Sequence, residues 1–213
     1  MRQPVFESQY QSFAEASDPA RAAPRMAALR AELKRRGLDG FIVPRADEHQ
    51  NEYVPPGAER LAWLTGFSGS AGAAIVLADK AALFVDGRYA IQAREQVDGR
   101  LFSICDLVSD PPARWLSREA SKGASIGFDP WLHTPAAAEA LRKGAEDAGA
   151  RLIAVEGNPI DAIWLDRPPA PCAPLVLHPE RLAGERAAKK LARIAENLGK
   201  PDGPVLSDPT AVG

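Results

Sequence analysis

Two short apolar runs separated by two polar residues constrain the fold of this chain more than any other feature. The runs cover residues 73–78 and 81–85, are rich in Val, Ile and Leu, and are joined by Asp79 and Lys80. Runs of this length and composition predict a tight β-hairpin that is buried on both faces. The turn type stays open, because Asp-Lys lacks the glycine of the most favoured two-residue turns.

Glycines flank the predicted hairpin at Gly66, Gly69, Gly72 and Gly87. Their spacing is not that of a GxGxxG loop, and a strand follows them where a phosphate-binding loop requires a helix N-terminus. We therefore favour turns that lead into the buried hairpin, with a phosphate site as the alternative.

A charged turn follows the second apolar run. It begins with Asp86, contains Arg88, and opens a predicted helix at residues 88–96. Charges in this position are expected at a sheet edge, where α/β sheets often bind ligands. The structural alternative is that Asp86 caps the helix and pairs with Arg88.

Apolar periodicity predicts that helices and strands alternate along the rest of the chain up to residue 165. Such alternation implies crossover connections and an α/β fold, in which a mixed sheet carries helices on both faces and the hairpin makes part of it antiparallel. The predicted helices cover residues 24–36, 59–64, 88–96, 111–120, 135–148 and 159–165, and the further strands cover 38–44, 101–107, 124–129 and 151–155.

Four prolines within RPPAPCAP, residues 167–174, mark a domain boundary. A segment so rich in proline can continue neither a helix nor a central strand, so it forms a stiff, extended connector. We therefore predict an N-terminal arm (1–22), a first domain (23–166), a Pro-rich linker (167–175) and the start of a second domain (176–213).

The residues beyond the linker hold one amphipathic helix, 179–198, and one short strand, 204–207. A helix and a strand cannot bury their own apolar faces. We therefore expect the chain to be cut within its second domain, and the helix to pack on the first domain or on a neighbouring chain.

Composition excludes several classes of protein. The net charge is −2 with interspersed signs, which gives no electrostatic case for binding nucleic acid or anionic membranes. The only cysteines, Cys105 and Cys172, form neither a disulfide framework nor a metal site, so we expect a reducing, cytoplasmic compartment. The polar start is unlike a secretory signal, and no apolar run approaches the roughly 20 residues of a membrane span.

The loop at residues 45–56 has the densest set of titratable groups, namely Asp47, Glu48, His49 and Glu52. A metal site is one interpretation. Because no pair of histidines has helical or comparable spacing, solvated loop charges are the favoured one.

Nucleophilic catalysis has little support in the sequence. Ser68 and Ser70 lie among the glycines, but nothing places a base beside them, and the histidines at positions 49, 133 and 178 are scattered. A Ser–His–Asp arrangement is therefore disfavoured. HExxH and P-loop motifs are absent from the sequence.

Five motifs in a fixed order resemble the N-terminal part of the Xaa-Pro aminopeptidases (aminopeptidase P), specifically the long, three-domain, cytosolic type. They are DEHQNEYVPP, WLTGFSGSAGAAIV, ALFVDGRYAIQA, IGFDPWLHT and NPIDAIWLDRPPAPCAPL, and the resemblance covers roughly residues 20–212. It implies a creatinase-type N-terminal domain with a mixed six-stranded sheet and helices on both faces. It also implies a second domain of similar fold that begins at Pro179.

In that family, a C-terminal domain removes the N-terminal residue that precedes a penultimate proline. It holds two divalent metals, commonly manganese, which generate hydroxide and polarise the carbonyl. The motifs of that domain do not occur in these 213 residues. The resemblance therefore implies a non-catalytic fragment without a metal of its own, inactive by itself.

The resemblance also implies a supporting role in the full enzyme. N-terminal domains of this family cover the active-site cleft, shape access for the peptide substrate and take part in homodimer contacts. Asp47 best fits the acidic residue that lies near the substrate amine in related enzymes, and a carboxylate suits a protonated amine. His49 and Arg88 are further substrate-proximal candidates by motif.

Two other functions compete with this hypothesis. One is a free-standing binding or interaction domain derived from such an enzyme, which predicts that the gene ends at Gly213. The other is an independent hydrolase that uses Ser68 or Ser70, which predicts turnover of a Xaa-Pro peptide without added metal.

Overall fold

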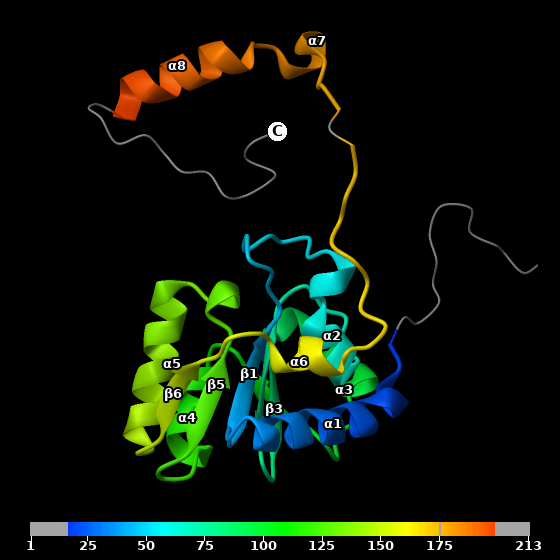
Figure 1. Ribbon diagram of the computed structural model, residues 1–213, viewed down its shortest axis with the longest axis vertical. Helices are drawn as coiled ribbons and strands as arrows, with labels where there is room; N and C mark the ends of the chain where they lie inside the picture. The colour runs from blue at the N-terminus through cyan, green and yellow to red at the C-terminus, as the bar shows by residue number, and fades with distance from the viewer. Residues whose placement is uncertain (1–16, 175, 199–213) are drawn as a thin grey trace, which may run out of the picture.

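The computed structural model describes residues 17–174 and 176–198, and a six-stranded mixed sheet forms its centre (Figure 1). The strands are β1 (Gly40–Pro44), β2 (Ala73–Leu77), β3 (Ala81–Val85), β4 (Ser103–Asp106), β5 (Ser125–Phe128) and β6 (Arg151–Ala154). Their order across the sheet is β4-β3-β2-β1-β5-β6. Strand β2 is antiparallel to both of its neighbours, whereas the other neighbouring pairs are parallel. The predicted mixed sheet is confirmed.

Helices cover both faces of the sheet (Figure 1). One face carries α1 (Ala22–Arg35), α2 (Arg60–Thr65), α3 (Ala90–Gln96) and α6 (Pro159–Ile163). The other face carries α4 (Pro112–Glu119) and α5 (Pro135–Asp147). Short 3-10 helices join these elements: η1 (Pro19–Arg21), η2 (Pro56–Ala58), η3 (Gly87–Tyr89) and η4 (Pro130–Leu132). The helix predicted at 88–96 is therefore η3 followed by α3.

The core consists of two layers, because successive strand residues point to opposite faces of the sheet. In β1, Phe41 and Val43 belong to the layer under α1, whereas Ile42 belongs to the layer under α4 and α5. In β3, Phe84 meets the ring of Trp115 edge-on, with ring centroids 6.0 Å apart. Burying a side chain of this size contributes about 1.5–3 kcal/mol, so short strands that are covered on both faces suffice for a stable sheet.

The central hairpin closes on a turn that the sequence left open. The Leu77 N–H donates to the Lys80 carbonyl oxygen at 2.8 Å, which makes Ala78 and Asp79 the turn residues. Neither has a positive φ, so the turn is not one of the type I′ or II′ turns that favour glycine. Arg30 of α1 donates its Nε to the Leu77 carbonyl oxygen at 2.9 Å, which ties the turn to the helix beside it.

The glycines before the hairpin act as bends, as predicted. Gly66 ends α2 with a φ of 82°, a conformation that glycine adopts without steric cost. A Cβ on Gly72 would lie 2.9 Å from the Phe84 carbonyl oxygen, so the backbone there approaches β3 closely. Strand β2, not a helix, follows this loop, so it lacks the geometry of a phosphate-binding loop.

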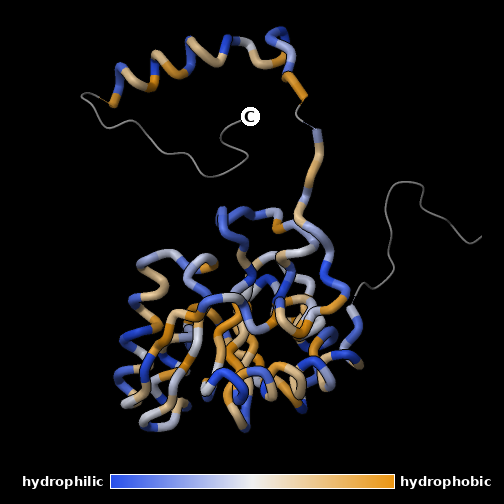
Figure 2. Tube along the Cα trace, viewed as in Figure 1, coloured by the Kyte–Doolittle hydropathy of each residue, from blue (hydrophilic) through white to orange (hydrophobic). Residues whose placement is uncertain are grey.

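The helix predicted at 179–198 is in fact two helices, and this prediction was wrong in its continuity. They are α7 (Glu180–Ala183) and α8 (Ala187–Leu198). The break lies at Gly184, whose φ of 75° is left-handed and ends α7. Neither helix has a buried residue, and both lie apart from the sheet (Figures 1 and 2). Packing on the first domain is therefore not observed, whereas packing on a neighbouring chain stays a prediction.

The Pro-rich segment 167–174 has neither helix nor strand, as predicted. The strand predicted at 204–207 and most of the predicted arm lie outside the described residues. The division into domains stays a prediction.

Across the described chain, every helix is too short or too polar to cross a membrane.

Candidate functional site

One edge of the sheet gathers all three segments that carry the predicted site residues. Pairing places the carboxyl end of β1 opposite the start of β2, with Pro44 across from Ala73, and the end of β3 beside them. The loop 45–55 after β1, the glycine loop 66–72 before β2 and the turn 86–89 after β3 therefore leave the sheet at the same edge. In Figure 1 the first of these loops rises above β1.

Asp47 is buried within its own loop, with only 1% of its surface exposed. Its Oδ1 accepts the backbone N–H groups of His49 at 3.0 Å and Asn51 at 2.9 Å, and its Oδ2 accepts the Asn51 side-chain amide at 2.7 Å. Burial raises the pKa of Asp47, but these donors outweigh it and hold that pKa below its usual value. The carboxylate therefore shapes the loop, and most of its hydrogen-bonding capacity is used there.

The side chains that this turn presents to solvent are those of its neighbours. His49 and Glu48 are 42% and 55% exposed, and His49 Nε2 lies 3.9 Å from Glu48 Oε1. Gln50 holds a positive φ of 57° and donates its backbone N–H to the Asp47 carbonyl oxygen. This tight turn around Asp47 directs His49 outward.

Arg45 is a central residue of this edge that the sequence patterns did not single out. Its Nη1 donates to the carbonyl oxygens of Glu52 at 2.9 Å and Ser70 at 3.0 Å, and its Nη2 pairs with Glu59 at 3.2 Å. It thereby joins the loop of Asp47 to the glycine loop. Burial raises the pKa of Glu59, and the Arg45 guanidinium opposes that rise. The sequence did contain a signal for Arg45, because a charged residue directly follows a predicted buried strand. The same signal singled out Asp86 after the second strand of the hairpin.

Arg88 is 70% exposed and forms a two-pronged ion pair with Asp86, with the Nη2–Oδ2 distance at 2.7 Å. Asp86 also accepts the Arg88 backbone N–H at 2.9 Å and caps η3. The hydrogen bonds from Arg88 lower the pKa of Asp86. The structural alternative stated for this turn, a cap and an ion pair, is therefore present.

Arg88 is joined to the glycine loop through its neighbour Tyr89. The Tyr89 hydroxyl and the Ser70 hydroxyl lie 2.5 Å apart, and the Arg88 guanidinium lies over the Tyr89 ring at 5.2 Å. In the described part of the chain, neither a hydrogen bond nor an ion pair links Arg88 directly to Asp47 or His49. The structure thus brings the three predicted residues to one edge, with Arg45 and Ser70 between their segments.

The residues weighed for nucleophilic catalysis are not arranged for it. Ser70 bonds Tyr89, and Ser68 bonds the side chains of Gln92 and Gln96. His133 is directed elsewhere, since its Nδ1 lies 2.8 Å from the Asp129 carbonyl oxygen. The described serines therefore have no histidine as a hydrogen-bond partner, and the Ser–His–Asp alternative gains no support.

The described residues also do not fit a metal centre. They contain no group of three or more His, Cys, Asp or Glu side chains placed to hold an ion. The carboxylates nearest to the predicted site are already engaged, Asp47 by its own loop and Asp86 by Arg88. No metal chemistry is therefore assigned to this part of the chain.

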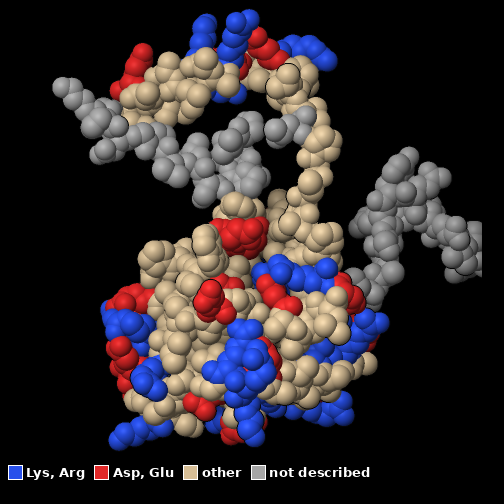
Figure 3. Space-filling view, viewed as in Figure 1, with Lys and Arg blue, Asp and Glu red and all other residues tan. Residues whose placement is uncertain are grey.

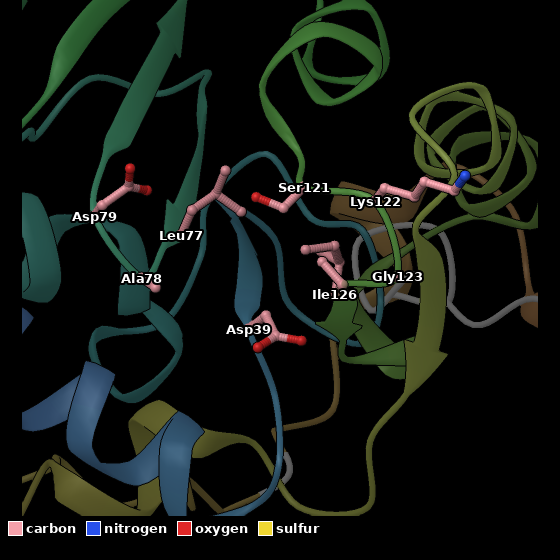
Figure 4. Close-up of a pocket in the computed structure, with 9 residues that line it drawn as sticks. Asp39, Leu77, Ala78, Asp79, Ser121, Lys122, Gly123 and Ile126 are labelled. Atoms are coloured by element: carbon pink, nitrogen blue, oxygen red, sulfur yellow. The ribbon is translucent and has the colours of Figure 1, made fainter.

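A hollow of about 350 Å³ lies at the opposite edge of the sheet (Figure 4). The carboxylates of Asp39 and Asp79 border it, while Lys122 points away from the other lining residues. Asp39 accepts the Ser125 backbone N–H at 2.8 Å. This hollow is separate from the edge that holds Asp47 and Arg88, and none of the predicted site residues lines it.

These features define an α/β domain with an open mixed sheet whose polar loops gather where the strands end. The chain belongs to the Creatinase/Prolidase N-terminal domain family, whose sequence profile matches residues 25–163. The predicted family resemblance is thus confirmed.

Curated relatives carry the name "Probable Xaa-Pro aminopeptidase P". The protein from Neurospora crassa is 39% identical over 180 residues, which are 83% of this chain and 26% of the relative. The protein from Coccidioides posadasii is 35% identical over 199 residues, 92% of this chain and 31% of the relative. The chain therefore spans only about a quarter to a third of the length of these relatives.

Solved structures agree with the fold. X-prolyl aminopeptidase from Caenorhabditis elegans, described as a cytosolic enzyme with a di-nuclear active site, matches with a TM-score of 0.76 and 31% identity. The match covers 83% of this chain and 31% of that one. The N-terminal domain of the cytoplasmic peptidase PepQ from Mycobacterium tuberculosis matches with a TM-score of 0.53 and 26% identity, over 66% of this chain and 98% of that one.

Proposed function

We propose that this chain is the non-catalytic N-terminal portion of a metal-dependent Xaa-Pro aminopeptidase, in which it shapes the access of peptides to the active site. The observation that carries the proposal is that Asp47, His49 and Arg88 lie at one sheet edge, the first two in the loop after β1 and Arg88 in η3. The similarity to aminopeptidase P along most of the chain supports it. The substrate would be a peptide with a free N-terminus and a penultimate proline.

The metal chemistry of this proposal belongs to residues outside the present chain. The C. elegans relative has a di-nuclear active site, and the family resemblance implies two divalent metals, manganese in particular. Metal ions in such enzymes supply hydroxide and polarise the scissile carbonyl. We therefore expect the 213-residue chain to be inactive by itself.

This edge of the sheet combines exposed apolar side chains with charged and polar ones, as expected of a surface that covers a cleft. Three large apolar side chains, Tyr53, Val108 and Trp131, are 76–84% exposed there, after the ends of β1, β4 and β5. Exposed apolar side chains next to polar groups are typical of interaction sites. The face shown in Figure 3 carries charges of both signs over the sheet domain. We propose that this edge faces the catalytic part of the protein.

Each candidate residue has a defined task in this proposal. Arg88 can exchange one of its two hydrogen bonds to Asp86 for a hydrogen bond to a peptide carbonyl or carboxylate. His49 lies at the surface of the same edge, and the buried Asp47 holds the loop that presents it. The role of Asp47 near the substrate amine stays a proposal. In this proposal the Asp47 carboxylate mainly holds the conformation of its loop.

Amide chemical shifts during titration with a Xaa-Pro-Pro tripeptide test the proposal. We expect shifts confined to residues 45–55, 68–72 and 86–89, with a free-amine peptide and not with its N-acetylated form. We expect no turnover with or without added manganese. Shifts elsewhere, or turnover of the peptide, would contradict the proposal.

Arg88→Gln provides the residue-level arm of this experiment, and Arg100→Gln is its matched control. Arg100 repeats the geometry of Arg88, since it pairs with Asp98 two residues earlier and bonds it through its backbone N–H at 2.9 Å. It precedes β4 at the opposite edge of the sheet. Only the Arg88 variant should lose the peptide-induced shifts.

The rival function is a free-standing binding domain. It predicts a gene that ends at Gly213, whereas our proposal predicts further coding sequence with metal ligands. A homodimer and a cytoplasmic location are part of the proposal through the resemblance, and the cytosolic C. elegans relative supports the location. Size measurement and cell fractionation of the complete protein test these two points.

A further inference from the structure

The Pro-rich segment begins on a cluster of ion pairs around Asp161 of α6. Arg60 of α2 donates its Nε to Asp161 Oδ1 at 2.7 Å and its Nη2 to Oδ2 at 2.9 Å. Arg167, the first residue of the Pro-rich segment, brings its Nη1 to 2.7 Å from Asp161 Oδ2. One carboxylate therefore holds two guanidinium groups from segments about a hundred residues apart in the sequence.

Breaking the ion pairs of this cluster costs free energy, because Arg60 is buried. Its side chain is 7% exposed, and its Nη1 is buried without a hydrogen-bond partner among the described residues. A buried cation in this state depends on its remaining partner, because removing one member of a buried pair is strongly destabilising. Asp161 is therefore held in place from the interior, whereas Arg167, 35% exposed, binds it from the surface.

Arg167 also reaches the end of the loop that carries Asp47 and His49. Its Nε donates to the Gly57 carbonyl oxygen at 2.6 Å. Gly57 lies in η2, directly after that loop, and a Cβ there would be 2.4 Å from the Pro168 carbonyl oxygen. The Pro-rich segment thus lies against η2 so closely that only glycine fits.

The loop is fastened at both ends. Arg45 ties its first residues to the glycine loop through Ser70, and Arg167 ties its last residues to the Pro-rich segment through Gly57. Proline restricts the backbone of the segment, so a displacement of its start is passed on to η2 rather than absorbed by bond rotation.

We propose that Arg167 is a positioning residue that couples the direction of the Pro-rich segment to the loop of Asp47 and His49. A change in how the downstream part of the protein is oriented would then alter the candidate site through Gly57. This inference rests on the proposed function for its biological meaning, since the loop matters only if it faces substrate. The coupling itself is a property of this chain and is tested without peptide.

The experiment measures both ends of the coupling in the 213-residue chain. Cys172 is exposed and lies five residues after Arg167, so a nitroxide on it reports the mobility of the Pro-rich segment. All proteins carry Cys105→Ala to make the label unique. Hydrogen exchange at the His49 and Asn51 amides, both bonded to Asp47, reports the loop.

Arg167→Gln removes both contacts, whereas Arg167→Lys keeps a charge for Asp161 and loses the bond to Gly57. We expect both variants to mobilise the label, and to accelerate exchange at the two amides by at least about fivefold, because a charge-assisted hydrogen bond is lost. Arg118→Gln, which breaks the exposed pair with Asp110 on the other face of the sheet, is the control and should change neither signal.

Two results would overturn the proposal. If the label becomes mobile while exchange at His49 and Asn51 changes less than about twofold, the contact is local and no coupling exists. If the label stays as immobile as in the parent protein, Arg167 does not hold the segment. Gly57→Ala provides an independent arm, because the added Cβ must displace Pro168 and should reproduce both effects.

Discussion

At the scale of single residues, the candidate site depends on where hydrogen-bond donors and acceptors are placed. Asp47 is stable as a buried carboxylate because three N–H groups of its own loop point at it. A buried charge without such donors would be neutralised instead. The same principle explains Arg45, whose guanidinium satisfies two carbonyl oxygens and one carboxylate.

Asp47→Asn should lower the free energy of unfolding by about 1–3 kcal/mol at pH 7, because an amide replaces Oδ2 and meets the Asn51 amide donor. The folded-state pKa of Asp47 is lowered. The stabilisation is therefore present above the unfolded pKa, about 3.9, and is lost as pH falls through the folded pKa. Urea unfolding at pH 7 and pH 3 should show the variant's deficit shrinking at the lower pH.

Asp79→Asn is the control for this prediction, since Asp79 is an exposed carboxylate in the hairpin turn. It should change stability by less than about 0.5 kcal/mol. A deficit of Asp47→Asn that is equal at both pH values would mean that the charge of Asp47 does not stabilise the loop.

At the scale of helices and strands, both local capping residues and close packing between helices determine how α5 is placed. Thr134 accepts the Ala137 N–H at 3.2 Å as the cap of α5, and Pro135 opens that helix, where the sequence predicts its start. The contact of α5 with α4 depends on Gly144. A Cβ there would lie 2.2 Å from the Ala113 carbonyl oxygen. Only the packed structure reveals this requirement, because glycine is otherwise unfavourable within a helix.

Gly144→Ala should therefore destabilise the chain by about 1–3 kcal/mol, although alanine is the better helix former. The added methyl group must push α4 and α5 apart. Gly99→Ala is the matched control, because a Cβ at Gly99 meets no atom of the described residues within 4 Å. Thermal unfolding of both variants checks this, and equal midpoints would show that the two helices move apart at no cost.

At the scale of the whole molecule, α8 stands out as an amphipathic helix without a partner among the described residues. Leu191, Ile194 and Leu198 lie on one side of it and are 37–62% exposed. An isolated helix of this length is marginal in water. We therefore expect its stability to come from contact with a neighbouring chain.

We expect hydrogen exchange in α8 to slow as protein concentration rises, because a neighbouring chain covers the apolar side. Leu191→Asp should abolish this dependence and leave exchange in α1 unchanged. Lys189→Gln, a change on the polar side, should preserve it. Exchange in α8 that is independent of concentration would contradict packing on a neighbouring chain.

The sequence by itself determined the order of helices and strands up to residue 165 and the doubly buried hairpin, because burial leaves a pattern of apolar residues. The family followed from the resemblance carried by five motifs. The sequence also placed Asp47 and His49 in the loop after a strand, and Arg88 in the turn that follows the hairpin and opens a helix. Only the tertiary structure decided that Asp47 is enclosed by its own loop, that Arg45 joins two loops, and that Asp161 binds Arg60 and Arg167. The contacts of Arg45 with Ser70 and of Arg60 with Asp161 join residues that are 25 and 101 positions apart. Their partners are set by how the strands are ordered in the sheet, which no local pattern records.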